Sequence, residues 1–121
     1  MTVEKYIKNF KNHYNLIHIF SNKNEYKIYH FRNKKTEKDI ILRSYSDEFP
    51  IYENLVDIRC FNLPDIYDVI HTDDGMIVLE EYIDGLTVSQ VIEGGQYRYK
   101  GAKKIIKAVC SALTVLHDRN L

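Results

Sequence analysis

The chain alternates short apolar runs with polar turns, a pattern typical of a small α+β domain. Residues 14–20 ("YNLIHIF") and 25–32 ("EYKIYHFR") are rich in β-branched and aromatic residues, and the polar sequence "SNKN" separates them. A second polar turn, "NKKTE", precedes a third run of the same kind at residues 38–45. These runs predict three consecutive antiparallel strands.

Beyond residue 45 the pattern predicts one short helix and a second pair of strands. Pro50 is followed by Ile51 and Leu55 at helical spacing, as expected for a helix that begins at a proline. Residues 63–70 and 76–82 then flank "HTDDG", whose Asp-Gly pair is a strong hairpin signal. The predicted order is therefore three strands, a helix and two strands.

Three more stretches have helical spacing. Residues 2–11 carry an apolar face behind Thr2, a good N-cap residue, and predict an amphipathic lead-in helix. Residues 87–95 predict a short helix that ends at two glycines, and residues 99–118 predict a longer helix. The apolar face of the longer helix comprises Ala102, Ile105, Ile106, Val109, Leu113 and Leu116.

Composition fits one domain and excludes several classes of function. The chain has 121 residues, 45% of them hydrophobic, which suffices for one domain with a core. Lysine plus arginine equal aspartate plus glutamate at 17 each, so no net charge attracts nucleic acid or an anionic membrane surface. No apolar run approaches the ~20 residues of a bilayer-spanning helix, and no signal peptide is evident. We therefore expect a cytoplasmic protein without a nucleic-acid or membrane partner.

The cysteines and histidines form no metal-binding pattern. Cys60 and Cys110 stand alone, so we expect two buried free thiols in a reducing compartment. The five histidines are scattered, and none makes an H-x-x-x-H pair. The sequence therefore predicts no metal site.

Four phrases connect these elements to a known family. "IVLEEYIDGLTVSQVI" (77–92) joins a buried strand, two adjacent carboxylates and a helical stretch. "TEKDIILRSY", "IYENLVDIRCFNLPDIYDVI" and "AVCSALTVLHDRNL" stand around it in a fixed order. Together, from about residue 14 to the end, they resemble the N-terminal lobe and the start of the C-terminal lobe of a Ser/Thr protein kinase of the type found in low-GC Gram-positive bacteria.

The resemblance implies a fold and a division of the chain. A lead-in helix over residues 1–13 would precede a kinase-like N-lobe over residues 14–82, with a five-stranded antiparallel sheet and helix C. The hinge and two helices of a truncated C-lobe would occupy residues 83–121. The function of the family is ATP-dependent phosphorylation of protein hydroxyl groups.

The resemblance also implies an adenine site at the hinge. By position, the carbonyl of Glu81 would accept a hydrogen bond from the adenine amino group, and the amide of Ile83 would donate one to a ring nitrogen. Ile28 and Ile41 are the other expected nucleotide contacts at this end, and Glu80 falls where kinases guard the back of the pocket. Without the flanking phrases, an edge strand that ends in two solvated glutamates would be the simpler interpretation.

The phosphate end of the site departs from the family pattern. The three glycine positions of the G-x-G-x-x-G loop, whose amides approach the phosphates, fall on Ser21, Lys23 and Tyr26. Lys23 would compensate in part through its charge, and an ordinary hairpin turn is the alternative. The lysine of strand three falls on Arg43, and the glutamate of helix C falls on Glu53. We expect a structural ion pair between Arg43 and Glu53 and no catalytic role for Arg43.

The resemblance implies that H-R-D-x-x-x-x-N and D-F-G motifs should follow, and neither occurs up to Leu121. We therefore expect this chain to bind ATP weakly, to bind Mg²⁺ only if a C-lobe is supplied, and to transfer no phosphate on its own.

Three interpretations stay open: a fragmentary or degenerate Ser/Thr kinase, a pseudokinase-like binding or scaffold module, and an unrelated α+β binding domain. The apolar face of the helix at 99–118 would then be uncovered and would dock a protein partner or a second copy.

Overall fold

The structure is a computed structural model that describes residues 1–85 and 99–121. These residues form two compact units. The first unit contains residues 1–58 and 64–82, and the second contains residues 59–63 and the described part of 83–121. The helix expected over residues 87–95 lies outside the described residues.

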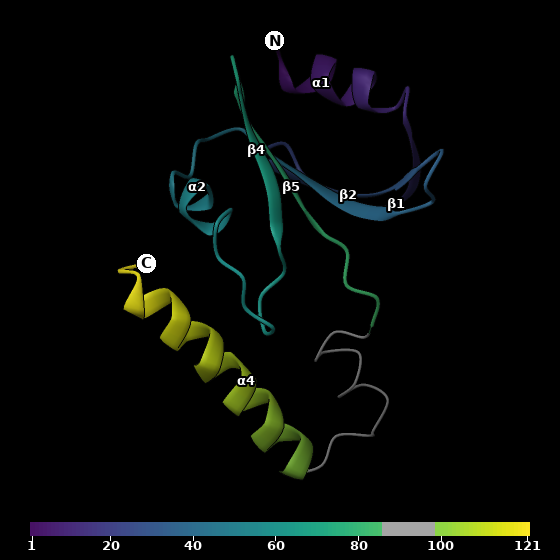
Figure 1. The fold of residues 1–121 in the computed structure, drawn as a ribbon. Helices are drawn as coiled ribbons and strands as arrows, with labels where there is room; N and C mark the ends of the chain where they lie inside the picture. Colours follow the sequence, from purple (N-terminus) through teal and green to yellow (C-terminus); the bar gives the residue numbers. More distant parts are fainter. Residues whose placement is uncertain (86–98) are drawn as a thin grey trace. The chain divides into compact units, whose positions relative to one another are not determined.

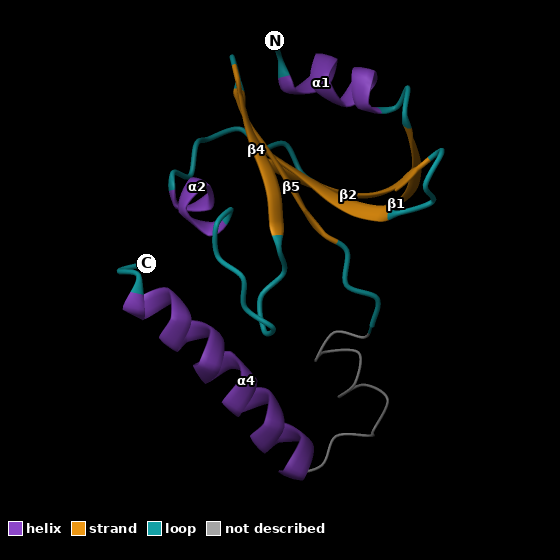
Figure 2. Cartoon of the chain, in the orientation of Figure 1, coloured by secondary structure: helices purple, strands orange, loops and turns teal. Residues whose placement is uncertain are grey.

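The first unit is built on a five-stranded antiparallel sheet, which confirms the α+β class (Figures 1 and 2). The strands stand in the spatial order β1-β2-β3-β5-β4, so β1 and β4 are the edges. Each pair of neighbours is antiparallel. The strands are β1 (Tyr14–Asn22), β2 (Tyr26–Asn33), β3 (Asp39–Tyr45), β4 (Ile66–Thr72) and β5 (Gly75–Glu81).

Helix α1 (Val3–Phe10) covers one face of the sheet and confirms the predicted lead-in helix. The Thr2 hydroxyl caps it by accepting a 3.2 Å hydrogen bond from the amide of Lys5. The sheet residues beneath the helix form a buried cluster of Phe31, Ile40, Leu42 and Ile77. The apolar residues of α1, Val3, Tyr6, Ile7 and Phe10, pack against this cluster.

The start of α1 is tied to the turn between β4 and β5. The terminal ammonium of Met1 lies 2.8 Å from a carboxylate oxygen of Asp73, and the amide of Val3 donates a 2.9 Å hydrogen bond to Asp74. The carboxylate of Asp74 thus accepts from one of the unpaired amides at a helix N-terminus. These contacts anchor the lead-in helix in the same compact unit as the sheet.

Helix α2 (Ile51–Leu55) belongs to the opposite face of the sheet. Ile66, Met76 and Val78 form the buried cluster on this side, and Tyr52 and Leu55 pack against it. The helix begins after Pro50, as the sequence predicts, but it has only five residues. Ile58, which follows the helix, is buried.

The turn between β4 and β5 confirms the Asp-Gly hairpin prediction, with Thr72 paired to Gly75. A side chain at Gly75 would have no space, because a Cβ atom there would lie 1.9 Å from the carbonyl oxygen of Tyr45 on β3. The glycine is therefore needed for the close approach of a neighbouring strand.

The second unit contains helix α4 (Tyr99–Asp118), which confirms the longer predicted helix. Ile106, Val109 and Leu113 form an exposed side of this helix. Val109 and Leu113 also border an apolar cavity of about 340 Å³, whose lining includes Ile105, Ala112, Leu116, Asn62 and Leu63. Association through the exposed side stays a prediction.

Two further observations concern cysteines and membranes. Cys60 is half-buried and Cys110 is exposed, so the expectation that both thiols are buried is wrong. Cys110 follows Ile106 by four residues and therefore shares the exposed side of α4. Among the described helices, none has the length and apolarity needed to cross a membrane.

Candidate functional site

The strand register brings four of the candidate residues onto one face of the sheet. Ile28 of β2 is paired with Arg43 of β3, and Ile41 of β3 is paired with Glu80 of β5. Cross-strand partners point to the same side, and residues two apart on one strand do so as well. Ile28, Ile41, Arg43 and Glu80 therefore share the face that carries α2, which we call the α2 face.

An ion pair joins β3 to β5 on the α2 face. The Nε atom of Arg43 donates a hydrogen bond to Oε1 of Glu80. The side chain of Glu80 is only 7% exposed, whereas that of Arg43 is 33% exposed. Burial lowers the pKa of Arg43, but the hydrogen bond and the charge of Glu80 outweigh it, so the pKa is raised overall. Arg43 therefore stays charged.

The expected ion pair between Arg43 and Glu53 is wrong. Glu53 of α2 instead contacts Nε2 of His71 on β4, and both of these side chains are exposed. The short helix α2 packs beside β4, so its glutamate reaches the edge strand, while β5 supplies the partner of Arg43. The hydrogen bond from His71 to Glu53 raises the pKa of the imidazole above its ordinary value.

The turn between β1 and β2 satisfies its own polar groups. The amide of Lys23 donates to the carbonyl of Tyr26 over 3.0 Å, and the Lys23 ammonium lies 5.3 Å from the centre of the Tyr26 ring. Hydrogen bonds to Lys23 and Ser21 lower the pKa of Tyr26. Ser21 itself is paired with Ile28 in the sheet. These contacts fit an ordinary hairpin turn better than a phosphate-binding loop. The Lys23 ammonium, which was expected to meet phosphates, lies over the Tyr26 ring instead.

The two predicted hinge residues fall in different compact units. Glu81 ends β5, where its amide donates a 2.8 Å hydrogen bond to the carbonyl of Asp65 and its carboxylate accepts one from the amide of Asp65. Ile83 belongs to the second unit and is exposed. The side chain and the amide of Glu81 are thus both hydrogen-bonded to Asp65, in the connection before β4.

A polar cluster that the sequence reasoning missed lies beside these residues. His30 of β2 is buried, and its Nε2 atom lies 2.9 Å from Oδ1 of Asp39 on β3. Arg32 donates to the same oxygen over 2.9 Å. These two hydrogen bonds, that of Arg32 first, lower the pKa of Asp39. The His30 ring also stacks on Tyr82, with 4.0 Å between the ring centroids. A histidine within the apolar run "KIYHF" was the available signal.

The described residues contain no group of three or more histidine, cysteine, aspartate or glutamate side chains that could hold a metal ion. Several polar groups of the α2 face contact one another: Arg43 pairs with Glu80, His30 and Arg32 share the carboxylate of Asp39, and the hydroxyl oxygens of Tyr45 and Tyr52 lie 2.7 Å apart. Burial and the hydrogen bond with Tyr45 raise the pKa of Tyr52. The face thus offers apolar contacts and paired polar groups.

No protein-family model matches the chain, and no curated protein matches its sequence.

Proposed function

We propose that the sheet is the nucleotide-binding lobe of a degenerate, protein-kinase-like module that holds an adenine group and does not transfer phosphate. The observation that carries this proposal is the ion pair between Arg43 and Glu80. At the position where the resemblance puts the phosphate-binding lysine, the cation is already paired with a carboxylate from the next strand.

The arrangement of the sheet supports the adenine part of the proposal. The elements follow the order that the resemblance implies, with three strands, a short helix and two strands. Ile28 and Ile41, the two apolar positions assigned to the nucleotide, share one face with Arg43. An adenine ring needs such apolar side chains together with backbone groups, and neither depends on a glycine-rich loop.

The charges on the α2 face support the absence of phosphate transfer. Phosphoryl transfer depends on cations that neutralise the phosphate oxygens. The Glu80 carboxylate cancels the charge of Arg43 and would repel a phosphate brought near it. Lys23, the other expected cation, lies on the Tyr26 ring. The phosphates of ATP should therefore add little to the affinity for adenosine.

Titration calorimetry with adenosine, ADP and ATP, each with and without Mg²⁺, tests the proposal. We expect the three affinities to agree within about threefold, a difference of less than 1 kcal/mol, and to change little with Mg²⁺. ATP binding that is tenfold tighter than adenosine binding and requires Mg²⁺ would contradict the proposal, and so would an absence of adenosine binding.

A charge variant sharpens the test. Glu80→Gln removes the negative charge but keeps the size of the side chain, so Arg43 becomes available to a phosphate. We expect ATP to gain on adenosine by roughly 5- to 20-fold in this variant, as for one charge-assisted hydrogen bond. Glu81→Gln is the matched control, because it makes the same chemical change one residue away and should leave the ratio unchanged. An equal change in both variants would show that Arg43 is not the controlling cation.

A further inference from the structure

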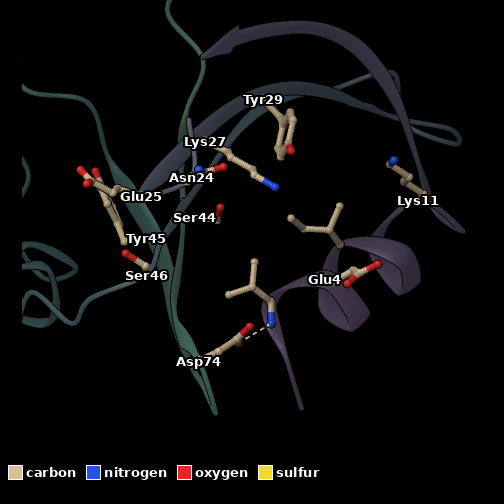
Figure 3. A pocket seen from close by; sticks show the side chains of 12 residues that line it. Glu4, Lys11, Asn24, Glu25, Lys27, Tyr29, Ser44, Tyr45, Ser46 and Asp74 are labelled. Carbon is tan, nitrogen blue, oxygen red and sulfur yellow. Dashed lines mark hydrogen bonds between the residues drawn. The ribbon is translucent and has the colours of Figure 1, made fainter. Parts of the chain in front are cut away.

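A second cavity lies on the opposite face of the sheet, beside α1. It has a volume of about 410 Å³, which falls within the range of small-molecule sites. Lys27, Tyr29 and Ser44 of β2 and β3 contribute to its floor (Figure 3). Val3 and Ile7 of α1 add apolar side chains to its lining. Because Ser44 and Arg43 are successive residues of one strand, this cavity and the Arg43–Glu80 pair lie on opposite faces.

The cavity forms where the sheet changes from apolar to polar residues. Along β3, the residues that face α1 are Ile40, Leu42 and then Ser44, and Lys27 of β2 is the cross-strand partner of Ser44. Helix α1 packs on the apolar part of this face. Ser44 is nevertheless only 4% exposed, and Lys27 is half-buried, so this polar end of the face is not an ordinary solvated surface.

Lys27 is the feature that points to a ligand. Its ammonium group projects into the space between the sheet and α1 (Figure 3). Among the ion pairs of the described residues, none includes Lys27. The ammonium of this half-buried lysine is therefore free to pair with a bound anion. Nearby, burial raises the pKa of Tyr29, so its hydroxyl keeps its proton and can donate a hydrogen bond.

We propose that this cavity binds a small organic anion whose carboxylate or phosphate head pairs with Lys27 and whose apolar part contacts Val3 and Ile7. Lys11, which follows α1 directly, also lines the cavity and adds a second positive charge. Three carboxylates line it as well, those of Glu4, Glu25 and Asp74, and Asp74 accepts a hydrogen bond from the amide of Val3. These negative charges disfavour a highly charged anion. The ligand is therefore a compact molecule with one anionic head and a short hydrocarbon portion.

Amide chemical-shift titration of the whole chain with acetate, butyrate and inorganic phosphate tests this inference and separates the two possible heads. We expect saturable shifts at residues 27, 29 and 44 and along α1. Butyrate should bind roughly 5- to 15-fold more tightly than acetate, because its two extra methylene groups are buried against the apolar wall. Saturation by phosphate but by neither carboxylate would assign the site to phosphate heads.

Substitution of Lys27 provides the decisive comparison. In Lys27→Gln we expect the affinity for butyrate or phosphate to fall at least fivefold, as for loss of one charge-assisted hydrogen bond. Lys5→Gln, the same change at an exposed position of α1 that does not line the cavity, should bind as the wild type does.

Three results would overturn the inference: no saturable shifts in the wild type, shifts confined to residues outside the cavity, or equal affinity in Lys27→Gln. The first two are measured on the unaltered chain, so the test holds even if Lys27→Gln does not fold. Adenosine should shift amides of the α2 face, so failure of one site leaves the other testable.

Discussion

The two faces of the sheet differ in what they bury. The face under α1 is a continuous apolar cluster in which Phe31, Leu42 and Ile77 are fully buried. The α2 face also has an apolar cluster, but it carries the Arg43–Glu80 ion pair as well. Both faces come from the same strands, so the difference lies in which alternate residues are polar.

This contrast indicates different roles for the two faces. A buried ion pair adds little net stability compared with apolar residues of similar size, because desolvation of the charges offsets their attraction. The apolar cluster under α1 is sufficient to hold the sheet and the helix together, whereas the charges on the α2 face are not required for that purpose. The α2 face can therefore serve a role other than stability, such as the proposed adenine site, and the predictions below test how much each face contributes to stability.

The largest effect is expected from a cavity in the α1 face. Leu42→Ala removes a fully buried side chain and should lower the free energy of unfolding by about 2–5 kcal/mol. Urea denaturation followed by circular dichroism measures the loss. Leu16→Ala, the same change at an exposed position of the edge strand β1, should cost much less. Similar losses at both positions would contradict the assignment of the core.

Breaking the ion pair on the α2 face should cost less. Glu80→Ala leaves the guanidinium of Arg43 half-buried without its partner and should destabilise the unit by about 1–3 kcal/mol. The double variant Arg43→Met, Glu80→Leu removes both charges and should recover most of that loss in the same denaturation experiment. A double variant less stable than the single one would show that the pair itself stabilises the fold.

Removal of the hydrogen bond between Tyr45 and Tyr52 should have a smaller effect. Tyr52→Phe keeps the ring on the buried cluster and loses only the 2.7 Å contact between the hydroxyl groups. We expect a loss of about 0.5–1.5 kcal/mol in the free energy of unfolding. Tyr67→Phe, at an exposed tyrosine, is the control and should be neutral. A neutral Tyr52→Phe would mean that the hydroxyl pair serves no structural purpose.

The smallest effect concerns the exposed contact of His71 with Glu53. Because the folded pKa of His71 is raised above its unfolded value, the contact stabilises the protein below the unfolded pKa, and this contribution is lost as pH rises through the folded pKa. The difference in unfolding free energy between the wild type and His71→Gln should therefore be larger at about pH 5.5 than at about pH 8.5.

His13→Gln replaces an exposed histidine that takes part in none of the ion pairs among the described residues. It should show no such pH dependence. A difference that grows with rising pH in His71→Gln would reverse the sign and contradict the contact.

The sequence alone determined the local elements of this protein. Alternation of apolar residues predicted the strands, Thr2 and the spacing behind it predicted α1, and the Asp-Gly pair predicted the turn before β5. Each of these signals depends on residues close together in the chain, where backbone preferences and side-chain periodicity act directly. The five strands and the described helices, the short α2 among them, were therefore predictable.

Only the tertiary structure decided which distant residues meet. Alternation tells which residues of a strand share a face, but it does not tell which strand lies beside it. The ion pair of Arg43 was therefore predicted with Glu53, whereas the β3–β5 register brings Arg43 to Glu80. The same register brings the carbonyl of Tyr45 against Gly75, where only a glycine fits. The Asp-Gly turn signal in the sequence does not show this requirement. Long-range pairing depends on packing of the whole sheet, and that sum of contacts is not written in any short stretch of the chain.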